Sequence, residues 1–174
     1  MFNSRALAIV AVIVGAAALR IVPHAPNFSP IGAMALFSGA HLSRRGAAFA
    51  APLAALLLSD AVLGFYSHME VVYGSMALVV CLGWGLAARR SPARIAGFSL
   101  AGSALFFLLT NFGVWAFDDL YPRSVSGLIA CYTAAIPFFQ SSLVGDLIYA
   151  ALFFGGFALI ERLVPALREP AGAV

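Results

Sequence analysis

Long apolar runs, separated by short polar or proline-rich segments, make up most of the chain. A helix rises about 1.5 Å per residue and a bilayer core is about 30 Å thick, so about 20 apolar residues can span it. A shorter apolar run, residues 31–41, predicts a short or steeply buried helix. We count it with the long runs, which gives six predicted spans. The five long runs are residues 6–22, 47–65, 71–88, 95–117 and 141–164.

Two proline-containing segments interrupt this pattern. Residues 23–30, PHAPNFSP, hold three prolines, which exclude a helix and favour an extended, rigid loop. Residues 125–139 are apolar but contain Pro137. We interpret them as a loop helix that partly dips into the membrane, separate from the last span.

The composition agrees with a membrane protein that has almost no soluble mass. Hydrophobic residues make up 63% of the 174 positions and charged residues only 10%, against about 25% charged in a soluble domain. We therefore expect an all-α integral membrane protein with one transmembrane domain, residues 1–174. The net charge of +3 does not indicate nucleic-acid binding, because the basic residues are all arginine and lie mostly at helix ends.

The arginines also predict the topology. One side of the predicted bundle carries Arg5, the pair Arg44 and Arg45, the group 89–94 and the C-terminal arginines, and the other carries only Arg20 and Arg123. The positive-inside rule then places both termini in the cytoplasm. We expect a multi-pass membrane protein, and we interpret residues 6–19 as the first helix rather than a cleaved signal peptide.

This topology gathers the polar residues of the spans in the outer half. Ionisable groups inside a membrane are costly and usually face a cavity or each other. The concentration of these polar residues in the outer half predicts a cavity that opens to the outside. A helix cap or a structural hydrogen bond would also explain each carboxylate. The candidate ligand-binding residues in this half are Asp60, Asn111 and Asp146 in the spans and His24, Asn27 and His68 in the loops.

Residues 71–88 carry a second candidate feature. At about 100° per residue, small side chains at Gly74, Ala77, Gly85 and Ala88 share one face with the thiol of Cys81. Such a face lets another group approach the backbone closely. That group is either a neighbouring helix or a bulky ligand with a metal facing Cys81, and the pattern alone leaves both open.

Common catalytic and nucleotide-binding motifs are missing from the sequence. It holds no HExxH, no G-x-S-x-G, no P-loop and no cysteine close in sequence to a histidine. A protease or a lipid-modifying enzyme is therefore disfavoured. An ATP-driven function would need a separate ATPase.

Several sequence segments resemble a known family. They are the pattern Pro23-His24-x-Pro26-Asn27-Phe28-x-Pro30, residues 56–60 with Gly64, and residues 73–83 around Cys81. With the six predicted spans, they resemble the S-components of energy-coupling-factor (ECF) vitamin transporters, and among these the solitary BtuM-type cobalamin transporters. The resemblance implies cobalamin uptake without catalysis of its own, an outward-facing pocket, and Cys81 as an axial ligand of the corrin cobalt.

The residues are chemically suited to that role. A thiolate is a soft donor for a late transition metal, and the small residues would let a flat macrocycle approach the helix. Tyr73 could then hydrogen-bond its amide side chains. Thiolate ligation would also remove an upper ligand such as cyanide from bound cobalamin. S-components usually dock on an energising module through small residues of helix one, here Ala11-x-x-x-Gly15, a departure from the usual pattern that fits a transporter able to act alone.

Two other interpretations remain open. The chain could transport another small vitamin, with Cys81 only packed, or it could be a small membrane enzyme or assembly subunit that transports nothing. Corrin absorption that depends on Cys81 would separate the first interpretation from these.

Overall fold

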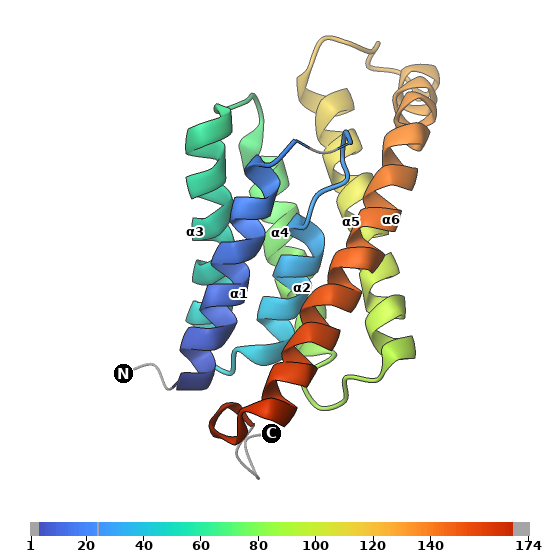
Figure 1. Cartoon of the computed structure of the whole chain (residues 1–174). Coiled ribbons are helices and arrows are strands. Elements are labelled where there is room, and N and C mark those ends of the chain that lie inside the picture. The colour runs from blue at the N-terminus through green and yellow to red at the C-terminus, as the bar shows by residue number, and fades with distance from the viewer. Residues whose placement is uncertain (1–3, 24, 169–174) are drawn as a thin grey trace.

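The computed structural model describes residues 4–23 and 25–168, which form six α-helices and a short 3₁₀-helix. Successive α-helices run in opposite directions, so the start of α1 and the end of α6 lie at the same end of the bundle (Figure 1). The helices are α1 (Ser4–Ile21), α2 (Ile31–His41), α3 (Arg45–Leu63), α4 (Met69–Trp84), α5 (Pro92–Phe117), α6 (Val125–Leu163) and the 3₁₀-helix η1 (Pro165–Leu167).

Four of these helices, α1, α3, α5 and α6, are long and apolar enough to cross a membrane, and α2 and α4 are shorter apolar helices. The long helices agree with the predicted runs at 6–22, 47–65 and 95–117. The short helix predicted for residues 31–41 is confirmed with the same bounds.

Helix α2 lies at the centre of the bundle and contacts all five other α-helices. Every residue from Ala33 to His41 is buried, as expected for a helix that is apolar on all sides. Its backbone approaches α4 so closely that a Cβ atom on Gly39 would overlap the Val80 carbonyl, and one on Gly83 would overlap the Leu36 carbonyl. Glycine at these positions therefore allows α2 and α4 to pack backbone to backbone.

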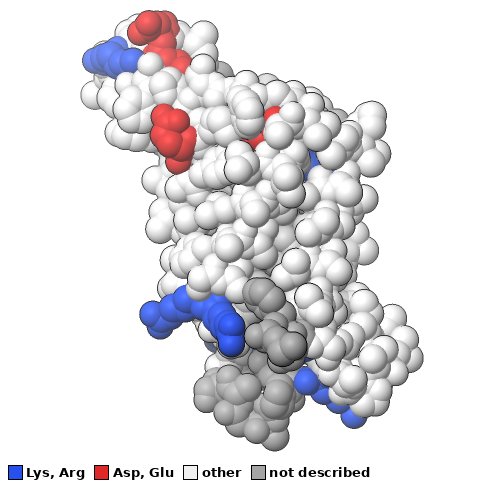
Figure 2. All heavy atoms as spheres, turned by 90° about the vertical axis from the view of Figure 1, so that its left-hand side faces the viewer, with Lys and Arg blue, Asp and Glu red and all other residues white. Residues whose placement is uncertain are grey.

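The two ends of the bundle differ in charge. We call the end with the start of α1 and the end of α6 the arginine-rich end, and the other the arginine-poor end. Figure 2 shows, on one face, arginines near the first and acidic residues near the second, with an uncharged surface between them. The arginine-rich end carries Arg5, Arg44, Arg45, Arg89, Arg90, Arg94, Arg162 and Arg168.

The sequence prediction for residues 71–88 was wrong in its bounds. Helix α4 starts at Met69 and ends at Trp84, and residues 85–89 continue as tight turns in which Gly85 and Leu86 bond back to Leu82 and Gly83. Two glycines so close together favour the end of a helix. Gly85 and Ala88 are therefore not part of the helical face that the sequence indicated.

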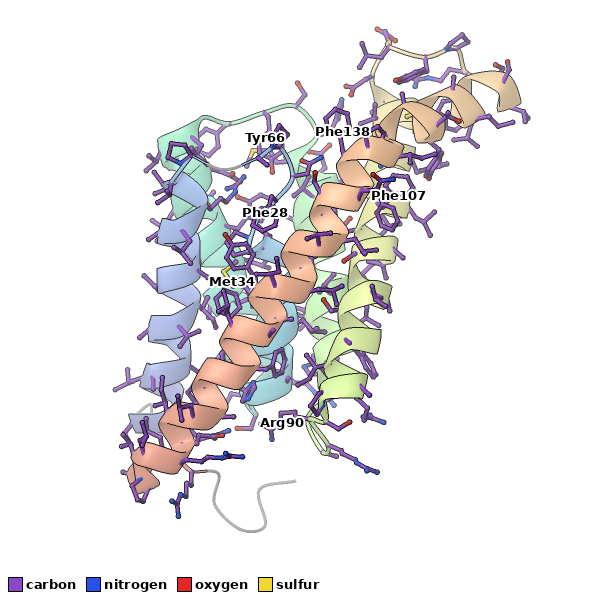
Figure 3. The ribbon with its side chains drawn as sticks, turned by 45° about the vertical axis from the view of Figure 1, so that its right-hand side comes forward. Phe28, Met34, Tyr66, Arg90, Phe107 and Phe138 are labelled. Carbon is purple, nitrogen blue, oxygen red and sulfur yellow. The ribbon has the colours of Figure 1, made fainter. Side chains whose placement is uncertain are left out.

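The prediction of a separate loop helix at 125–139 was also wrong. Residues Val125–Leu163 form one continuous helix, capped by Ser124, whose hydroxyl accepts a hydrogen bond from the Gly127 amide at 3.2 Å. Pro137 lies inside it, where it removes one backbone hydrogen bond and bends the helix instead of ending it. Figure 3 shows this bend close to Phe138.

Candidate functional site

The shortness of α2 leaves room for a cavity at the arginine-poor end. Its 11 residues rise about 16 Å, roughly half of a bilayer core. Beyond it lies a cavity of about 240 Å³, near the labelled Phe107 and Phe138 in Figure 3. We call it the aromatic cavity; its lining is Asn27, Val72, Ser103, Phe106, Phe107, Thr110, Asn111, Ala135, Phe138, Phe139 and Ser142.

The polar side chains of the aromatic cavity bond mainly to their own helices. The Asn111 amide nitrogen donates to the Phe107 carbonyl at 2.8 Å, and the Thr110 hydroxyl donates to the Phe106 carbonyl at 2.8 Å. These bonds use the Thr110 hydroxyl hydrogen and one of the two Asn111 N–H groups, and they leave the Asn111 amide oxygen and the Thr110 hydroxyl oxygen as acceptors. The cavity therefore offers aromatic surface with a few oxygen acceptors, a mixture typical of sites for organic molecules.

Ser103 connects this cavity to a narrow crevice that holds Asp146. The Ser103 hydroxyl donates to the Asp146 carboxylate at 2.6 Å, and the Ala33 backbone in the first turn of α2 also bonds to Asp146. A carboxylate at this place complements the free amides of the helix start. A Cβ atom on Gly32 would overlap the carboxylate, so glycine makes room for it.

Two buried hydroxyl groups near this point have no hydrogen-bond partner among the described residues. They belong to Ser99, which lines the crevice, and to Ser29. Buried polar groups are nearly always paired, so these hydroxyls indicate a polar region that a water molecule or a ligand would complete.

Asp60 belongs to a different cluster, which joins α1, α3 and α4. Its carboxylate is fully buried and accepts hydrogen bonds from Arg20 and from the Tyr73 hydroxyl, the latter at 2.7 Å. Arg20 also donates to Ser59 at 2.6 Å. In the adjoining loop, burial and the nearby Asp60 charge raise the pKa of Tyr66 to about 12. Asp60 and Tyr73 thus already have partners and do not line the aromatic cavity.

His68 joins the start of α4 to the end of α5. Its Nδ1 lies 3.2 Å from Glu70 and its Nε2 lies 3.2 Å from Asp118, and its ring is 5.3 Å from that of Phe117. Asn27, by contrast, lines the cavity and has a left-handed backbone with φ of 60°. His24 lies outside the described residues.

The Cys81 face of α4 points away from the bundle core. Gly74 is exposed, and a Cβ atom on it would have no neighbour within 4 Å, while Ala77 and Cys81 are half-buried. Among the described residues, no helix therefore covers Gly74. Gly85 is exposed but lies close to the Phe98 ring.

Cys81 lies apart from the other candidate residues. It is eight positions beyond Tyr73 toward the arginine-rich end, a rise of about 12 Å, and it lines neither the aromatic cavity nor the crevice. Among the described residues, no group of three or more His, Cys, Asp or Glu side chains is arranged to hold a metal ion.

The structure thus brings together Asn27, Asn111 and, through the crevice, Asp146. It also shows two residues that the sequence analysis missed, Ser99 and Ser103. Their spacing of four, which places them on one face of α5, was visible in the sequence. Their position beside Asp146 was not, because Ser103 and Asp146 are 43 residues apart in the chain.

The fold and these sites define a multi-pass, all-α membrane protein with a polar, aromatic-lined cavity at one end. The chain belongs to the family described as DUF6580, a family of unknown function, whose model matches residues 1–167. No curated protein and no solved structure matched the chain in these comparisons.

Proposed function

We propose that this protein is a substrate-binding membrane transporter of the S-component type, with six membrane-inserted helices and substrate entry at the arginine-poor end. The observation that carries the proposal is the aromatic cavity above α2, with the unpartnered hydroxyl of Ser99 in the crevice below it. The packed residues of α2 close the bundle beneath this cavity. A substrate site that packed residues separate from the opposite end is what a transporter needs before its substrate moves.

The orientation follows from the charge at the two ends. Cytoplasmic loops carry an excess of arginine and lysine, so the arginine-rich end faces the cytoplasm in this proposal. Both termini are then cytoplasmic, and the aromatic cavity opens to the outside of a bacterial inner membrane.

Cobalamin is the substrate that we propose, on the basis of the resemblance to BtuM-type transporters and of the state of Cys81. The thiol is free and half-buried, and Gly74 on the same face is uncovered. Both features keep this face available to a flat macrocycle. Because Cys81 and the aromatic cavity lie on different faces, cobalt ligation and cavity binding are separate parts of the proposal.

The first experiment is a visible absorption spectrum of the detergent-purified protein after incubation with cobalamin. A shifted corrin band in the wild type and in Cys131→Ser, but not in Cys81→Ser, supports cobalt–thiolate ligation. Cys131 is the matched control because it is the second free cysteine and is buried. If no variant retains corrin, cobalamin is not the substrate.

Removal of cyanide from bound cyanocobalamin tests the chemistry of the thiolate. We expect Cys81→Ala to remove cyanide much more slowly than the wild type, because a strong donor below the cobalt weakens the bond above it. Equal rates in the two proteins would rule out this role of Cys81.

The size of the aromatic cavity favours a second candidate, transport of a smaller vitamin. Its volume of about 240 Å³ is just below the range of about 300–1,000 Å³ that is common for small-molecule sites. A larger substrate would require α5, α6 and the loop 23–30 to separate. Thermal stabilisation by a small vitamin, lost in Asn111→Leu but kept in Cys81→Ser, would support this candidate over cobalamin.

The face of α1 that carries Ala11 and Gly15 is available to a partner. Both residues are exposed, and a Cβ atom on Gly15 would meet nothing within 4 Å. We propose this face as the docking site for an ECF-type energising module, with docking not obligatory. Uptake by cells that lack such a module, unchanged in Gly15→Leu, would show that the protein acts alone.

A further inference from the structure

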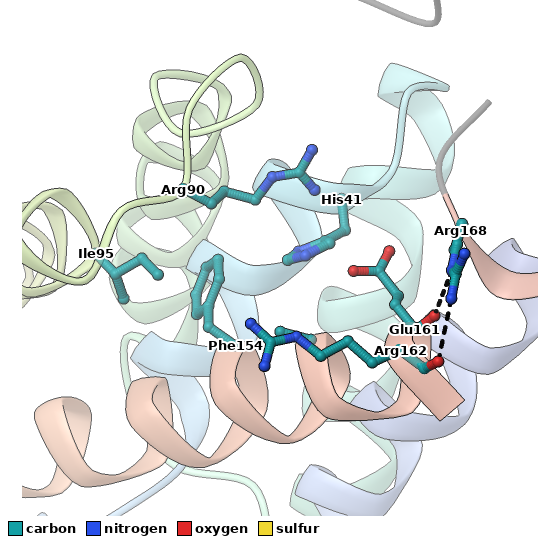
Figure 4. A pocket seen from close by; sticks show the side chains of 8 residues that line it. His41, Arg90, Ile95, Phe154, Glu161, Arg162 and Arg168 are labelled. Carbon is teal, nitrogen blue, oxygen red and sulfur yellow. Dashed lines mark hydrogen bonds between the residues drawn. The ribbon is translucent and has the colours of Figure 1, made fainter. Parts of the chain in front are cut away.

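A second cavity, of about 400 Å³, lies at the arginine-rich end, opposite the aromatic cavity. We call it the basic cavity. It is formed by the end of α2, the α4–α5 loop, the start of α5 and the end of α6. Figure 4 shows its side chains in close view. Its lining is His41, Arg90, Ile95, Phe154, Ala158, Glu161, Arg162 and Arg168.

Positive charge dominates this cavity. Three guanidinium groups line it against one carboxylate, Glu161, and this carboxylate is already paired with Arg5 at 2.7 Å. Among the described residues, Arg168 donates to the backbone carbonyls of Glu161 and Arg162, at 3.1 and 3.2 Å, as the dashed lines in Figure 4 show. An anion in the cavity would therefore meet the guanidinium groups of Arg162 and Arg168, which no carboxylate of the described residues neutralises.

Arg162 is the most available of these donors. It is exposed, and within the described ranges its side chain makes no hydrogen bond or ion pair. The planar guanidinium group carries several N–H donors and matches the oxygens of a phosphate group.

An apolar lane leads from Arg162 toward the middle of the membrane. Ala151, Gly155 and Ala158 precede Arg162 in α6 at spacings of three and four residues, so all three share one face of the helix with Arg162. All three are exposed, and a Cβ atom on Gly155 would meet nothing within 4 Å. The lane is thus an exposed strip of small side chains, and Ala158 belongs both to it and to the cavity.

We propose that the basic cavity binds the phosphate group of an anionic phospholipid, whose acyl chain lies along the lane of Ala151, Gly155 and Ala158. A free anion would use the cavity but not the lane. The lane therefore favours a lipid over a free anion. Basic pockets between membrane helices of other proteins bind lipid head groups. The bound lipid would hold the α4–α5 loop against the end of α6 at the closed end of the bundle.

Native mass spectrometry of the full-length, delipidated protein in detergent tests the proposal, with phosphatidylglycerol, phosphatidylcholine and inorganic phosphate as probes. We expect one tightly retained phosphatidylglycerol and no comparable phosphatidylcholine. Arg162→Gln should weaken retention about tenfold, the size expected for one hydrogen bond to a charged group. Arg44→Gln is the matched control, because it removes an exposed arginine from the same end but outside the cavity.

A second pair of variants separates the lipid from a free anion. Gly155→Leu puts a bulky side chain on the lane, at a position where the Cβ atom has open space, and should weaken phosphatidylglycerol binding. Gly15→Leu makes the same change at an open position of α1 and should not. Equal loss in Arg44→Gln and Arg162→Gln would overturn the site. Displacement of the lipid by millimolar inorganic phosphate, or unchanged lipid binding in Gly155→Leu, would overturn the lipid as its occupant.

Discussion

The cluster around Asp60 joins three helices, and its contribution to stability can be measured. Asp60 of α3 bonds to Arg20 of α1 and accepts from Tyr73 of α4 at 2.7 Å. Removing one partner of a buried ion pair costs about 3–5 kcal/mol, because the remaining charge stays buried. The Arg20 side chain is 15% exposed and can turn partly toward water. We therefore expect Asp60→Ala to lower the free energy of unfolding by about 3 kcal/mol, the low end of that range.

The Tyr73 hydroxyl should contribute less. A hydrogen bond to a charged group contributes about 1.5–3 kcal/mol in soluble proteins, whereas bonds within membranes average about 0.6 and reach about 1.7 kcal/mol. Since the acceptor is a fully buried carboxylate, we expect about 1.5 kcal/mol for Tyr73→Phe. In the Asp60→Ala background the same substitution has no charged acceptor to lose, and it should cost less than about 0.5 kcal/mol.

Unfolding of the detergent-purified protein, followed by tryptophan fluorescence, measures all four members of this double-mutant cycle. Asp119→Ala is the control, because it removes a fully exposed carboxylate whose nearest Arg123 nitrogen is 3.8 Å away, and its unfolding should match the wild type. The reasoning is refuted if the effects of Asp60→Ala and Tyr73→Phe add to within about 0.3 kcal/mol.

Three further predictions follow from the packing and charge of single residues. Gly83→Ala should destabilise the protein by about 1–3 kcal/mol in the same unfolding assay, because its Cβ atom would press on α2, and Gly74→Ala, in open space, should not; equal effects would contradict the close approach. A membrane-permeable maleimide should label the half-buried Cys81 in the folded protein, but should label Cys131, 2% exposed, only after unfolding, as mass spectrometry of peptides would show. The raised pKa of Tyr66 keeps its phenol neutral in the folded state, so its stabilising effect is complete below pH 10 and is lost as pH rises toward about 12. Tyr66→Phe should lose less stability than the wild type across this interval, and identical pH profiles would contradict the assignment.

The sequence was sufficient to predict the helices whose position and length follow from their apolar pattern alone. The run 31–41 is short and apolar on all sides, a pattern typical of a helix surrounded by other helices or by lipid, and the structure places it among the other helices. The ends of other helices depended on competing local effects. Helix α6 continues through Pro137. A bend at a proline loses one backbone hydrogen bond, whereas two new helix ends would leave several backbone groups without partners.

The candidate site was harder to predict, because it depends on which faces of the helices meet. The polar pattern grouped Asn111 with Asp146, and the structure places the first in the aromatic cavity and the second in the crevice that Ser103 joins to it. It could not show that Asp60 is already paired with Arg20, forty positions earlier in the chain. The small-residue face of α4 was likewise visible in the sequence, but only the position of α2 decides that Gly74 faces outward and Gly83 inward.

The length of α2 also has a consequence for how the protein is made. Eleven residues are too few to be inserted as an independent span, which needs about 17–25. The translocation machinery therefore has only the longer helices on either side, α1 and α3, as membrane-entry signals in this part of the chain. We therefore expect the central helix to enter the membrane only together with its longer neighbours.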